Sequence, residues 1–255
     1  MKNAYIFDSH AHYDDKKFEG MREELLEKMP ENNVQGIINC GTDIATSLFS
    51  IDLAQRYPFV YAAVGYHPES IDDSTVFERA ELIKLAKSEK VKAIGEIGLD
   101  YYWDTTFKEQ QIDFFEQQLA LATTLNLPAI IHDRDAHADT LSILKKHKPK
   151  GVLHCFSGSA EMAKEVLSLG MYIGVGGVVT FKNSKKIIEV VKQLPIERIL
   201  LETDAPYLAP EPHRGKLNNS AYIKFIAEKI AEIKNLSVTE ILSITASNAK
   251  TLFNI

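Results

Sequence analysis

The sequence has few cysteines, no excess of basic residues and no long hydrophobic run, and each absence excludes a class of protein. Among its 255 residues only Cys40 and Cys155 are cysteines, which are too few for a disulfide framework. Lys and Arg total 29 against 35 for Asp and Glu, so the net charge of −6 argues against a protein that coats duplex nucleic acid. No apolar stretch is long enough to cross a bilayer.

The sequence also lacks a secretory signal, a linker and any low-complexity segment. Its beginning reaches Asp8 and His10 after only a short apolar run, unlike a signal peptide. With two cysteines and no signal, we expect a cytoplasmic protein. The composition, 45% hydrophobic and 25% charged, is that of a globular chain, and we expect residues 1–255 to form a single domain.

What the sequence does contain is a regular alternation of short β-branched runs and longer amphipathic stretches. The alternation predicts parallel strands joined by helical crossovers. The expected strands are residues 5–8, 36–40, 60–64, 92–97, 128–131, 151–154, 172–176 and 198–202. The expected helices are residues 19–29, 44–56, 77–88, 107–125, 136–147, 160–169, 184–193, 220–233 and a final one at 238–252.

Eight strand–helix units in about 250 residues predict the α/β fold known as the (β/α)8 or TIM barrel, here with an extra C-terminal helix. A doubly wound open sheet is the competing architecture. Its usual glycine-rich turn after the first strand is missing. The one glycine cluster, in residues 174–177, lies at the seventh strand instead, and we interpret it as close packing at the barrel wall.

Polar residues gather where the expected strands end. Because barrel active sites are built at that edge from several strands, their placement matters more than any single residue. Each of these side chains alone has an ordinary structural interpretation, as a surface or hydrogen-bonded core residue. The set comprises His10, His12, His67, Glu96, His132, His154 and Asp204.

His10 and His12 form the first pair. Side chains two residues apart on a strand share a face, so both imidazoles point toward the mouth of the barrel and suit one metal ion. Asp8 is expected on the same face, one layer deeper, where it would orient a ligand.

The acidic residues complete the set. A buried Glu96 is costly unless it is paired or coordinated, and opposite two histidines it suits a carboxylate that bridges two metal ions. Asp204 lies nearest the edge and is the expected metal ligand, while Glu202 supports it from behind. With His132 and His154, these residues give a dinuclear ligand set for two divalent ions, Zn²⁺, Mn²⁺, Mg²⁺ or Ni²⁺.

At this point the chain resembles the TatD-type metal-dependent deoxyribonucleases of the amidohydrolase superfamily. The similarity runs in order from residue 8 to the C-terminus, and the ordered set is far more specific than any one motif. The matching stretches are Asp8-Ser9-His10-Ala11-His12, Gly65-Tyr66-His67-Pro68, Gly95-Glu96-Ile97-Gly98-Leu99-Asp100-Tyr101, His132-Asp133-Arg134-Asp135-Ala136, His154-Cys155-Phe156-Ser157-Gly158, Glu202-Thr203-Asp204-Ala205-Pro206-Tyr207-Leu208, Pro212-His213-Arg214-Gly215-Lys216 and Ser247-Asn248-Ala249-Lys250-Thr251-Leu252-Phe253.

The resemblance implies a barrel, two divalent ions and hydrolysis of DNA phosphodiesters, as in a 3′–5′ exonuclease. It implies that His10, His12, Glu96 and Asp204 hold one ion, and that Glu96, His132 and His154 hold the second. The sequence departs from the family at Leu217-Asn218-Asn219-Ser220, where Arg-Asn-Glu-Pro is common. A cation and an acid are thereby lost beside the mouth.

A mechanism follows from this ligand set. Two ions that share a water lower its pKa, and the water then attacks phosphorus. We expect Glu96 and Asp204 to be catalytic, with Asp204 as the proton acceptor. Arg134 would neutralise a phosphate oxygen, or else pair with a neighbouring Asp. His67 would position substrate or water, or else stabilise a turn.

Further residues are expected to bind substrate. Tyr102 and Trp103 follow the fourth strand, where they would stack on exposed bases or simply pack in a loop. The resemblance adds His213 and Arg214. Alternation along the sixth strand turns Cys155 away from the face that His154 uses, which argues against a thiol nucleophile.

Three functions remain open from the sequence. The first is a deoxyribonuclease that acts on single-stranded DNA or DNA ends without sequence preference and needs no protein partner. The second is an amidohydrolase or esterase acting on a cyclic amide, a lactone or an aminoacyl ester with the same metals. The third is a metal-free binding scaffold, which would leave the converging Asp, Glu and His side chains unexplained.

Overall fold

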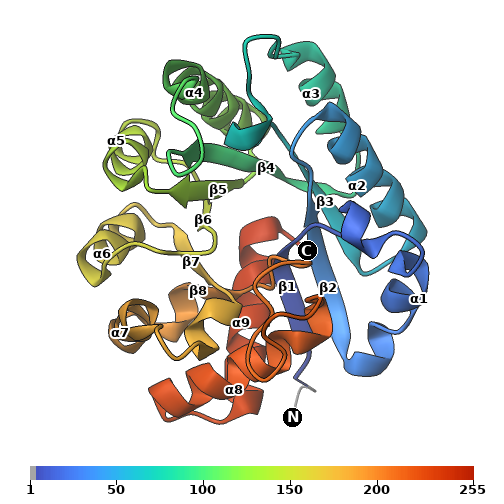
Figure 1. Ribbon diagram of the computed structural model, residues 1–255, viewed down its shortest axis with the longest axis vertical. Helices are drawn as coiled ribbons and strands as arrows, with labels where there is room; N and C mark the ends of the chain where they lie inside the picture. The colour runs from blue at the N-terminus through green and yellow to red at the C-terminus, as the bar shows by residue number, and fades with distance from the viewer. Residues whose placement is uncertain (1–3) are drawn as a thin grey trace.

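The structure, a computed structural model, describes residues 4–255 and is built around one sheet of eight parallel strands. The strands follow one another in chain order, and the helices surround them (Figure 1). This arrangement confirms the expected (β/α)8 barrel. The strands are β1 (Ile6–Ala11), β2 (Val34–Cys40), β3 (Val60–Val64), β4 (Val91–Asp100), β5 (Ala129–Arg134), β6 (Gly151–Leu153), β7 (Tyr172–Val175) and β8 (Ile199–Leu201).

The first and last strands meet and close the ring. The Ser9 hydroxyl donates to the carbonyl of Leu201 at 3.0 Å. Beyond the end of β8, the backbone N–H of Asp204 donates to the His10 carbonyl at 3.0 Å, and that of His12 donates to Ala205 at 2.7 Å. Closure therefore brings the two halves of the metal-ligand motif, from opposite ends of the chain, side by side.

The helices follow the expected order, and the final one has a separate position. Figure 1 shows α9 within the ring of the other helices, beside β1 and β8. Within residues 4–255, none of the helices has the length and apolar character needed to cross a membrane. They are α1 (Arg22–Glu27), α2 (Ile44–Arg56), α3 (Arg79–Leu85), α4 (Lys108–Leu125), α5 (His137–His147), α6 (Ala160–Ser168), α7 (Lys185–Gln193), α8 (Ile223–Lys234) and α9 (Val238–Phe253), with 3₁₀ turns η1 (Lys16–Phe18), η2 (Pro30–Asn32), η3 (Pro68–Ser70), η4 (Gly177–Thr180), η5 (Ile196–Arg198) and η6 (Ser220–Tyr222).

Helix α9 seals the N-terminal end of the barrel. Its Phe253 stacks on Phe7 of β1 with ring centroids 6.3 Å apart, and both belong to the apolar cluster that fills the barrel interior. The amide of Asn248 donates to two carbonyls, those of Ile196 and Ile199, at 2.9 Å each. With one end closed by apolar packing, polar chemistry is confined to the C-terminal end.

Three strands extend three residues further at their C-terminal ends than expected and three end one residue earlier, and these ends surround the site. Strand β1 runs to Ala11, β4 to Asp100 and β5 to Arg134, so His10, Glu96 and His132 lie within strands. Strands β6 and β8 end at Leu153 and Leu201. Strand backbones fix side chains more tightly than loops do, so the longer strands hold their polar residues in a defined geometry.

Candidate metal centre

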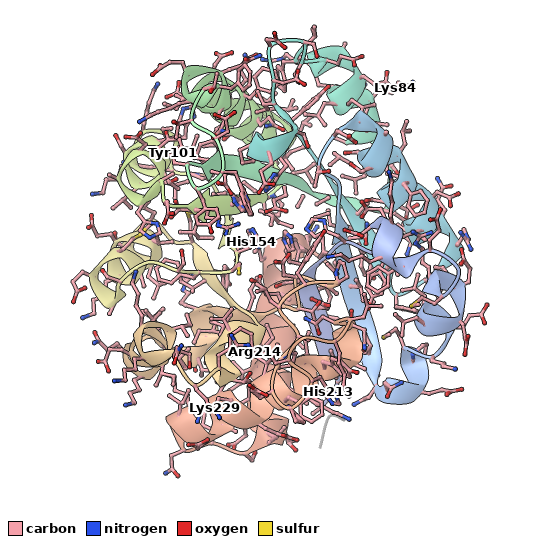
Figure 2. All side chains as sticks on the ribbon, viewed as in Figure 1. Lys84, Tyr101, His154, His213, Arg214 and Lys229 are labelled. Atoms are coloured by element: carbon pink, nitrogen blue, oxygen red, sulfur yellow. The ribbon has the colours of Figure 1, made fainter. Side chains whose placement is uncertain are left out.

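A solvent-open cavity of about 800 Å³ lies at the C-terminal ends of the strands. Its floor is formed by the buried histidines and Glu96, and its upper wall by side chains from the loops. Figure 2 shows His154 near the middle of the molecule, at this floor. The structure thus brings together the polar residues that the sequence placed at strand ends. The lining includes His12, His67, Glu96, Trp103, His132, Arg134, His154, Cys155, Asp204, Tyr207 and Leu208.

Glu96 is at the centre of the cluster, and its two carboxylate oxygens face different imidazoles. Oε2 lies 3.2 Å from Nε2 of both His10 and His12. Oε1 lies 2.8 Å from Nδ1 of His132 and 2.6 Å from Nε2 of His154. The donor atoms on each side lie within 4.8 Å of one another. The carboxylate therefore divides the four imidazoles into two pairs.

The first pair is held by a residue that sequence analysis missed. The Cys40 carbonyl accepts from Nδ1 of His12 at 2.9 Å, and the Cys40 thiol lies 3.5 Å from Nδ1 of His10. Asp204 closes this side of the cluster, with Oδ1 3.6 Å from Nε2 of both rings. One residue of β2 thus orients both imidazoles, and only the register of β1 against β2 reveals it.

The second pair has a partner that the sequence also failed to indicate. Asp100 is 1% exposed, and its Oδ2 lies 2.9 Å from Nε2 of His132. Alternation along β4 puts Asp100 on the face of Glu96, but the expected strand ended at residue 97. Gly98 lies between them, at φ +145°, and a side chain there would collide with the His132 carbonyl. Glycine at this position lets β4 approach β5 closely enough for both contacts.

Glu202 is buried beside His154 of the second pair. Oε1 of Glu202 accepts from the backbone N–H of Cys155 and lies 3.9 Å from Nδ1 of His154. Nδ1 of His154 and Oε2 of Glu202 have no hydrogen-bond partner among the described residues. A Cβ at Gly174 would lie 2.4 Å from Oε2 of Glu202, so close packing accounts for this glycine, as the sequence predicted.

The hydrogen bonds of the rings show that the cluster suits cations. A carbonyl only accepts, so the bond to Cys40 leaves a lone pair on Nε2 of His12. The Asp100 carboxylate likewise accepts from Nε2 of His132 and leaves a lone pair on Nδ1. When these two rings are neutral, both lone pairs point at Glu96, so acceptors face acceptors unless each ring takes a second proton or a cation lies between them. Divalent cations relieve this repulsion and accept these nitrogen and oxygen ligands.

The charges of the cluster also perturb its titration. Burial disfavours an ionised Glu96, yet the imidazoles of His154 and His67 hold its pKa well below the usual range. Burial disfavours the charged form of His132, but hydrogen bonds to Asp100 and Glu96 raise its pKa to about 10. Burial raises the pKa of Glu202 to about 8. Several strongly shifted groups around one cavity are typical of a functional site.

His67 differs from the other four imidazoles. Its Nδ1 accepts from the backbone N–H of Glu69 at 3.1 Å, which caps η3. The ring proton of neutral His67 is therefore on Nε2, which lies 3.3 Å from Oε1 of Glu96. The sequence left a turn-stabilising role and a cavity role as alternatives, and the geometry shows both contacts in the same ring.

The expected position of Asp8 is wrong. Its carboxylate bonds to Thr203 and Ser220 instead of contacting an imidazole, at 2.6 Å from each hydroxyl. The register of β1 is irregular between Asp8 and Ala11, so simple alternation fails there. Asn218 donates to the carbonyls of Thr203 and Tyr207 at 2.8 and 2.7 Å. Two residues of the departing segment, Asn218 and Ser220, thus anchor the loop that carries Asp204.

Arg134 and Trp103 form part of the cavity's upper wall, and Tyr102 packs beside both of them. The Arg134 guanidinium lies 3.8 Å from the ring centroid of Tyr102 and 5.2 Å from that of Trp103. No ion pair with Asp133 or Asp135 is formed, and Asp133 pairs with His137 at 2.7 Å instead. Tyr102 and Trp103 are 52% and 65% exposed. Their expected roles in substrate binding remain predictions.

Alternation predicted that Cys155 points away from the site, and this prediction is wrong. Strand β6 ends at Leu153, and Cys155 adopts a left-handed conformation at φ 42° and lines the cavity. Burial, together with the carboxylates of Asp204 and Glu202, raises its pKa well above the usual range. The thiol is therefore protonated. The conclusion that Cys155 is no nucleophile stands on this protonation state and not on the direction of its side chain.

His213 and Arg214 lie outside the cavity lining. His213 stacks on Tyr222 with ring centroids 4.2 Å apart, and the Arg214 guanidinium lies 4.2 Å from the centroid of Phe181. Both belong to the loop that follows β8, on the side of α7 and α8. From there they do not reach a substrate that is confined to the metal centre. A longer substrate that extends beyond the cavity would reach them.

Comparisons with known proteins agree with this geometry. A family model described as TatD related DNase matches residues 7–254. The chain is 46% identical to the uncharacterized metal-dependent hydrolase YabD of Bacillus subtilis, over 98% of this chain and 99% of the relative. It is 33% identical to the 3'-5' ssDNA/RNA exonuclease TatD of Erwinia tasmaniensis, over 98% of this chain and all of that one (100%).

Among solved structures, the chain is similar to YjjV, a TatD homolog from Escherichia coli K12. The two share 33% sequence identity and superpose with a TM-score of 0.89, over 98% of each chain. The resemblance expected from the motifs is therefore confirmed in sequence and in fold.

Proposed function

The chain belongs to the family of TatD-related DNases and is a metal-dependent hydrolase, and from this premise we propose that it cleaves phosphodiester bonds at the ends of single-stranded DNA. The observation that carries the proposal is the position of Glu96, which separates two imidazole pairs at the floor of an open cavity. The exonuclease relative from Erwinia tasmaniensis supports removal of nucleotides from the 3′ end.

We assign two divalent ions to the cluster. Mg²⁺, Mn²⁺, Zn²⁺ and Ni²⁺ all accept such nitrogen and oxygen ligands. When bound, the ions supply Lewis acidity that activates a water and positive charge that neutralises a phosphate. Glu96 would be shared, with His10, His12 and Asp204 on one side and His132 and His154 on the other.

The chain's own residues would act on the proton and the phosphate. Asp204 has one carboxylate edge toward His10 and His12 and is open to the cavity, so it is placed to take a proton at its free oxygen. The Arg134 guanidinium donates hydrogen bonds to a phosphate oxygen. The N–H at Nε2 of His67 holds Glu96 in place or donates to a water beside it.

The shape of the cavity favours an unpaired strand end. A volume of about 800 Å³ accepts a nucleotide or two but is too small to enclose a duplex. Trp103, in the loop after β4, and Tyr207, in the loop after β8, line the mouth of the cavity and offer aromatic faces to a base. Recognition through stacking and phosphate carries no base identity, so we propose cleavage without sequence preference.

The test is a cleavage assay with single-stranded DNA labelled at its 5′ end, using Mn²⁺-loaded protein. We expect progressive shortening from the 3′ end that chelation stops. Asp204→Asn should abolish shortening, whereas Asp133→Asn, which alters a carboxylate that pairs with His137 and not with an imidazole of the cluster, should retain it. Intact DNA together with hydrolysis of a cyclic amide or an aminoacyl ester would replace this proposal by the amidohydrolase alternative.

A further inference from the structure

The rim of the cavity differs in charge from one side to the other. The loops that follow β2, β3 and β4, residues 41–43, 65–78 and 101–107, contain six acidic residues and no Lys or Arg. Five of the six are exposed. We call this part the acidic rim. Its residues are Asp43, Glu69, Asp72, Asp73, Glu78 and Asp104.

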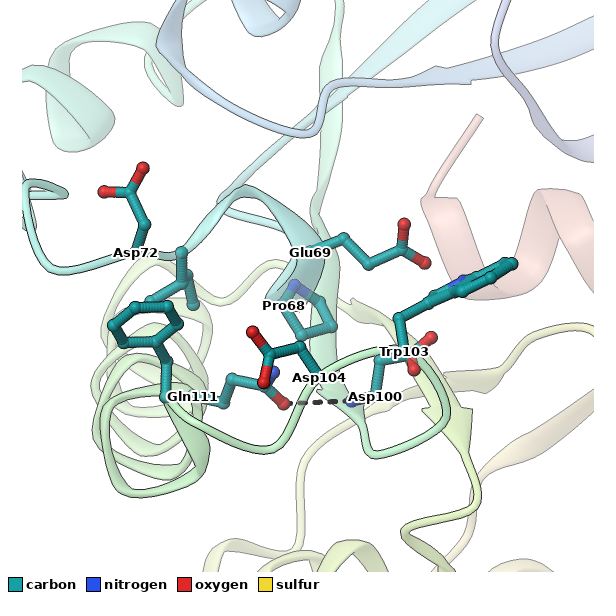
Figure 3. Close-up of a pocket in the computed structure, with 9 residues that line it drawn as sticks. Pro68, Glu69, Asp72, Asp100, Trp103, Asp104 and Gln111 are labelled. Carbon is teal, nitrogen blue, oxygen red and sulfur yellow. Dashed lines mark hydrogen bonds between the residues drawn. The ribbon is translucent and has the colours of Figure 1, made fainter.

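The acidic rim includes a small side cavity of about 260 Å³ beside the main one (Figure 3). Carboxylates of Glu69, Asp72, Asp100 and Asp104 line it, and Trp103 separates it from the main cavity. Four carboxylates around so small a volume repel a phosphate. A polyanionic strand that leaves the metal centre is therefore disfavoured in this direction.

The opposite side of the rim is basic. The segment that follows β7 and the loop that follows β8 carry five exposed cations, and the acids nearest to them in the sequence are the half-buried Glu211 and the exposed Glu189, further along α7. Within residues 4–255 none of the five has a carboxylate within 4.0 Å, unlike Lys145, Lys146 and Lys229, which are paired. We call this part the basic rim. It comprises Lys182, Lys185, Lys186, Arg214 and Lys216.

Direct contacts connect the basic rim to the cavity. Leu208 lines the cavity, and three residues further on the backbone N–H of Glu211 donates to the Thr180 hydroxyl at 2.9 Å. The Arg214 guanidinium lies 4.2 Å from the ring centroid of Phe181, the residue before Lys182. In Figure 2, Arg214 and Tyr101 lie on opposite sides of His154, as the two parts of the rim require. The basic rim thus begins where this wall of the cavity ends.

We propose that the basic rim is a track for the single-stranded DNA that continues beyond the nucleotide at the metal centre. The inference rests on the proposed function and adds the direction in which the strand leaves, over β7 and β8 and away from the acidic rim. In a chain of net charge −6, unpaired cations gathered at one edge of the cavity provide the local attraction that the whole molecule lacks.

The proposal separates long substrates from short ones. Cations on the track contact phosphates beyond the bond that is cleaved, and they do so equally before and during the reaction. Removing them should therefore raise KM for a long strand and leave kcat unchanged. A small phosphodiester that fills only the metal centre should not respond.

The experiment compares two triple variants of the metal-loaded protein. Lys182→Gln/Arg214→Gln/Lys216→Gln removes three charges from the basic rim. The matched control, Lys87→Gln/Lys150→Gln/Lys192→Gln, removes three exposed charges near the N-terminal ends of the strands. For a single strand of about 20 nucleotides, kcat/KM of the rim variant should fall on the order of tenfold at low salt, and its slope against log salt should become shallower by about 2. Hydrolysis of bis(4-nitrophenyl) phosphate should stay within about twofold for both variants.

Binding of the same labelled strand, followed by fluorescence anisotropy, separates the two ways of failing. Equal salt slopes for the two triple variants overturn the track, whether or not the DNA is cut. A shallower slope for the rim variant in a protein that cuts no DNA supports the track and overturns the proposed nuclease function. A rim variant that also loses activity on the small phosphodiester overturns the track, because its residues would then act at the metal centre.

Discussion

The floor and the rim of the cavity are built differently. At the floor, Glu96 is 2% exposed and lies within 3.2 Å of four imidazole nitrogens. At the rim, Trp103 and Tyr207 are 65% and 42% exposed. Strand backbones and buried hydrogen bonds fix the floor residues, whereas loops and solvent surround those of the rim. We therefore expect changes at the floor to act on metal binding and kcat, and changes at the rim to act on KM.

The largest effect should come from the residue shared by both sides of the floor. Glu96→Ala should lower the metal content below two ions per chain and reduce turnover by at least about 10³-fold, because both ions lose a ligand. Metal analysis with the cleavage assay checks this. Glu197→Ala, an exposed acid at the other end of the barrel, is the control. Full activity of the Glu96 variant would contradict the expectation that changes at the floor act on metal binding and kcat.

Next come two neighbours that line the same cavity and differ in chemistry. His154→Ala should abolish hydrolysis because it removes a ligand facing Glu96 at 2.6 Å. Cys155→Ser should keep most activity, since a protonated thiol is replaced by a hydroxyl of similar size. Activity measured with saturating metal compares the two. Equal losses would mean that Cys155 takes part in the chemistry.

A smaller effect is expected at Asp100, which is hydrogen-bonded to the proposed metal ligand His132. Asp100→Ala should weaken divalent-metal affinity by about 10–100-fold, because the partner that orients His132 is lost. Asp100→Asn should recover part of it, since its carbonyl still accepts from Nε2. Metal affinity is measured by competition with a chelator. Asp133→Asn serves as control, and an equal loss there would point to general destabilisation instead of ring orientation.

The smallest effect belongs to the rim. Tyr102→Ala and Trp103→Ala should raise KM for single-stranded DNA by about fivefold to tenfold and change kcat by less than about twofold, because stacking holds ground and transition states equally. Leu48→Ala on α2, which removes an apolar side chain of similar exposure, should leave both unchanged. A fall in kcat without a change in KM would place these aromatics in the chemical step.

The same division explains what the sequence could predict. The strand–helix alternation predicted the barrel, and the pairing of His10 with His12 and the central place of Glu96 follow from strand ends alone. Asp8 was misplaced because an irregular register in β1 cannot be read from alternation. Cys155 was misplaced because β6 ends two residues before it.

The residues that orient the imidazoles from neighbouring strands could not be predicted from the sequence. Asp100 and Cys40 orient imidazoles on neighbouring strands, and such contacts depend on strand register, which no local pattern contains. At the rim, the loop after β8 places His213 and Arg214 against Tyr222 and Phe181, outside the cavity lining, so their expected contact with substrate is a prediction for longer strands only. Loop paths depend on packing across the whole molecule, which is why the rim was harder to predict than the floor.

The most direct test of the account is the anomalous scattering of crystals grown with Mn²⁺, measured at a wavelength where manganese scatters strongly. The account predicts two manganese peaks on opposite sides of the Glu96 carboxylate, one beside His10 and His12 and the other beside His132 and His154. A single peak, or peaks away from Glu96, would contradict the assignment of two metal ions that share this residue.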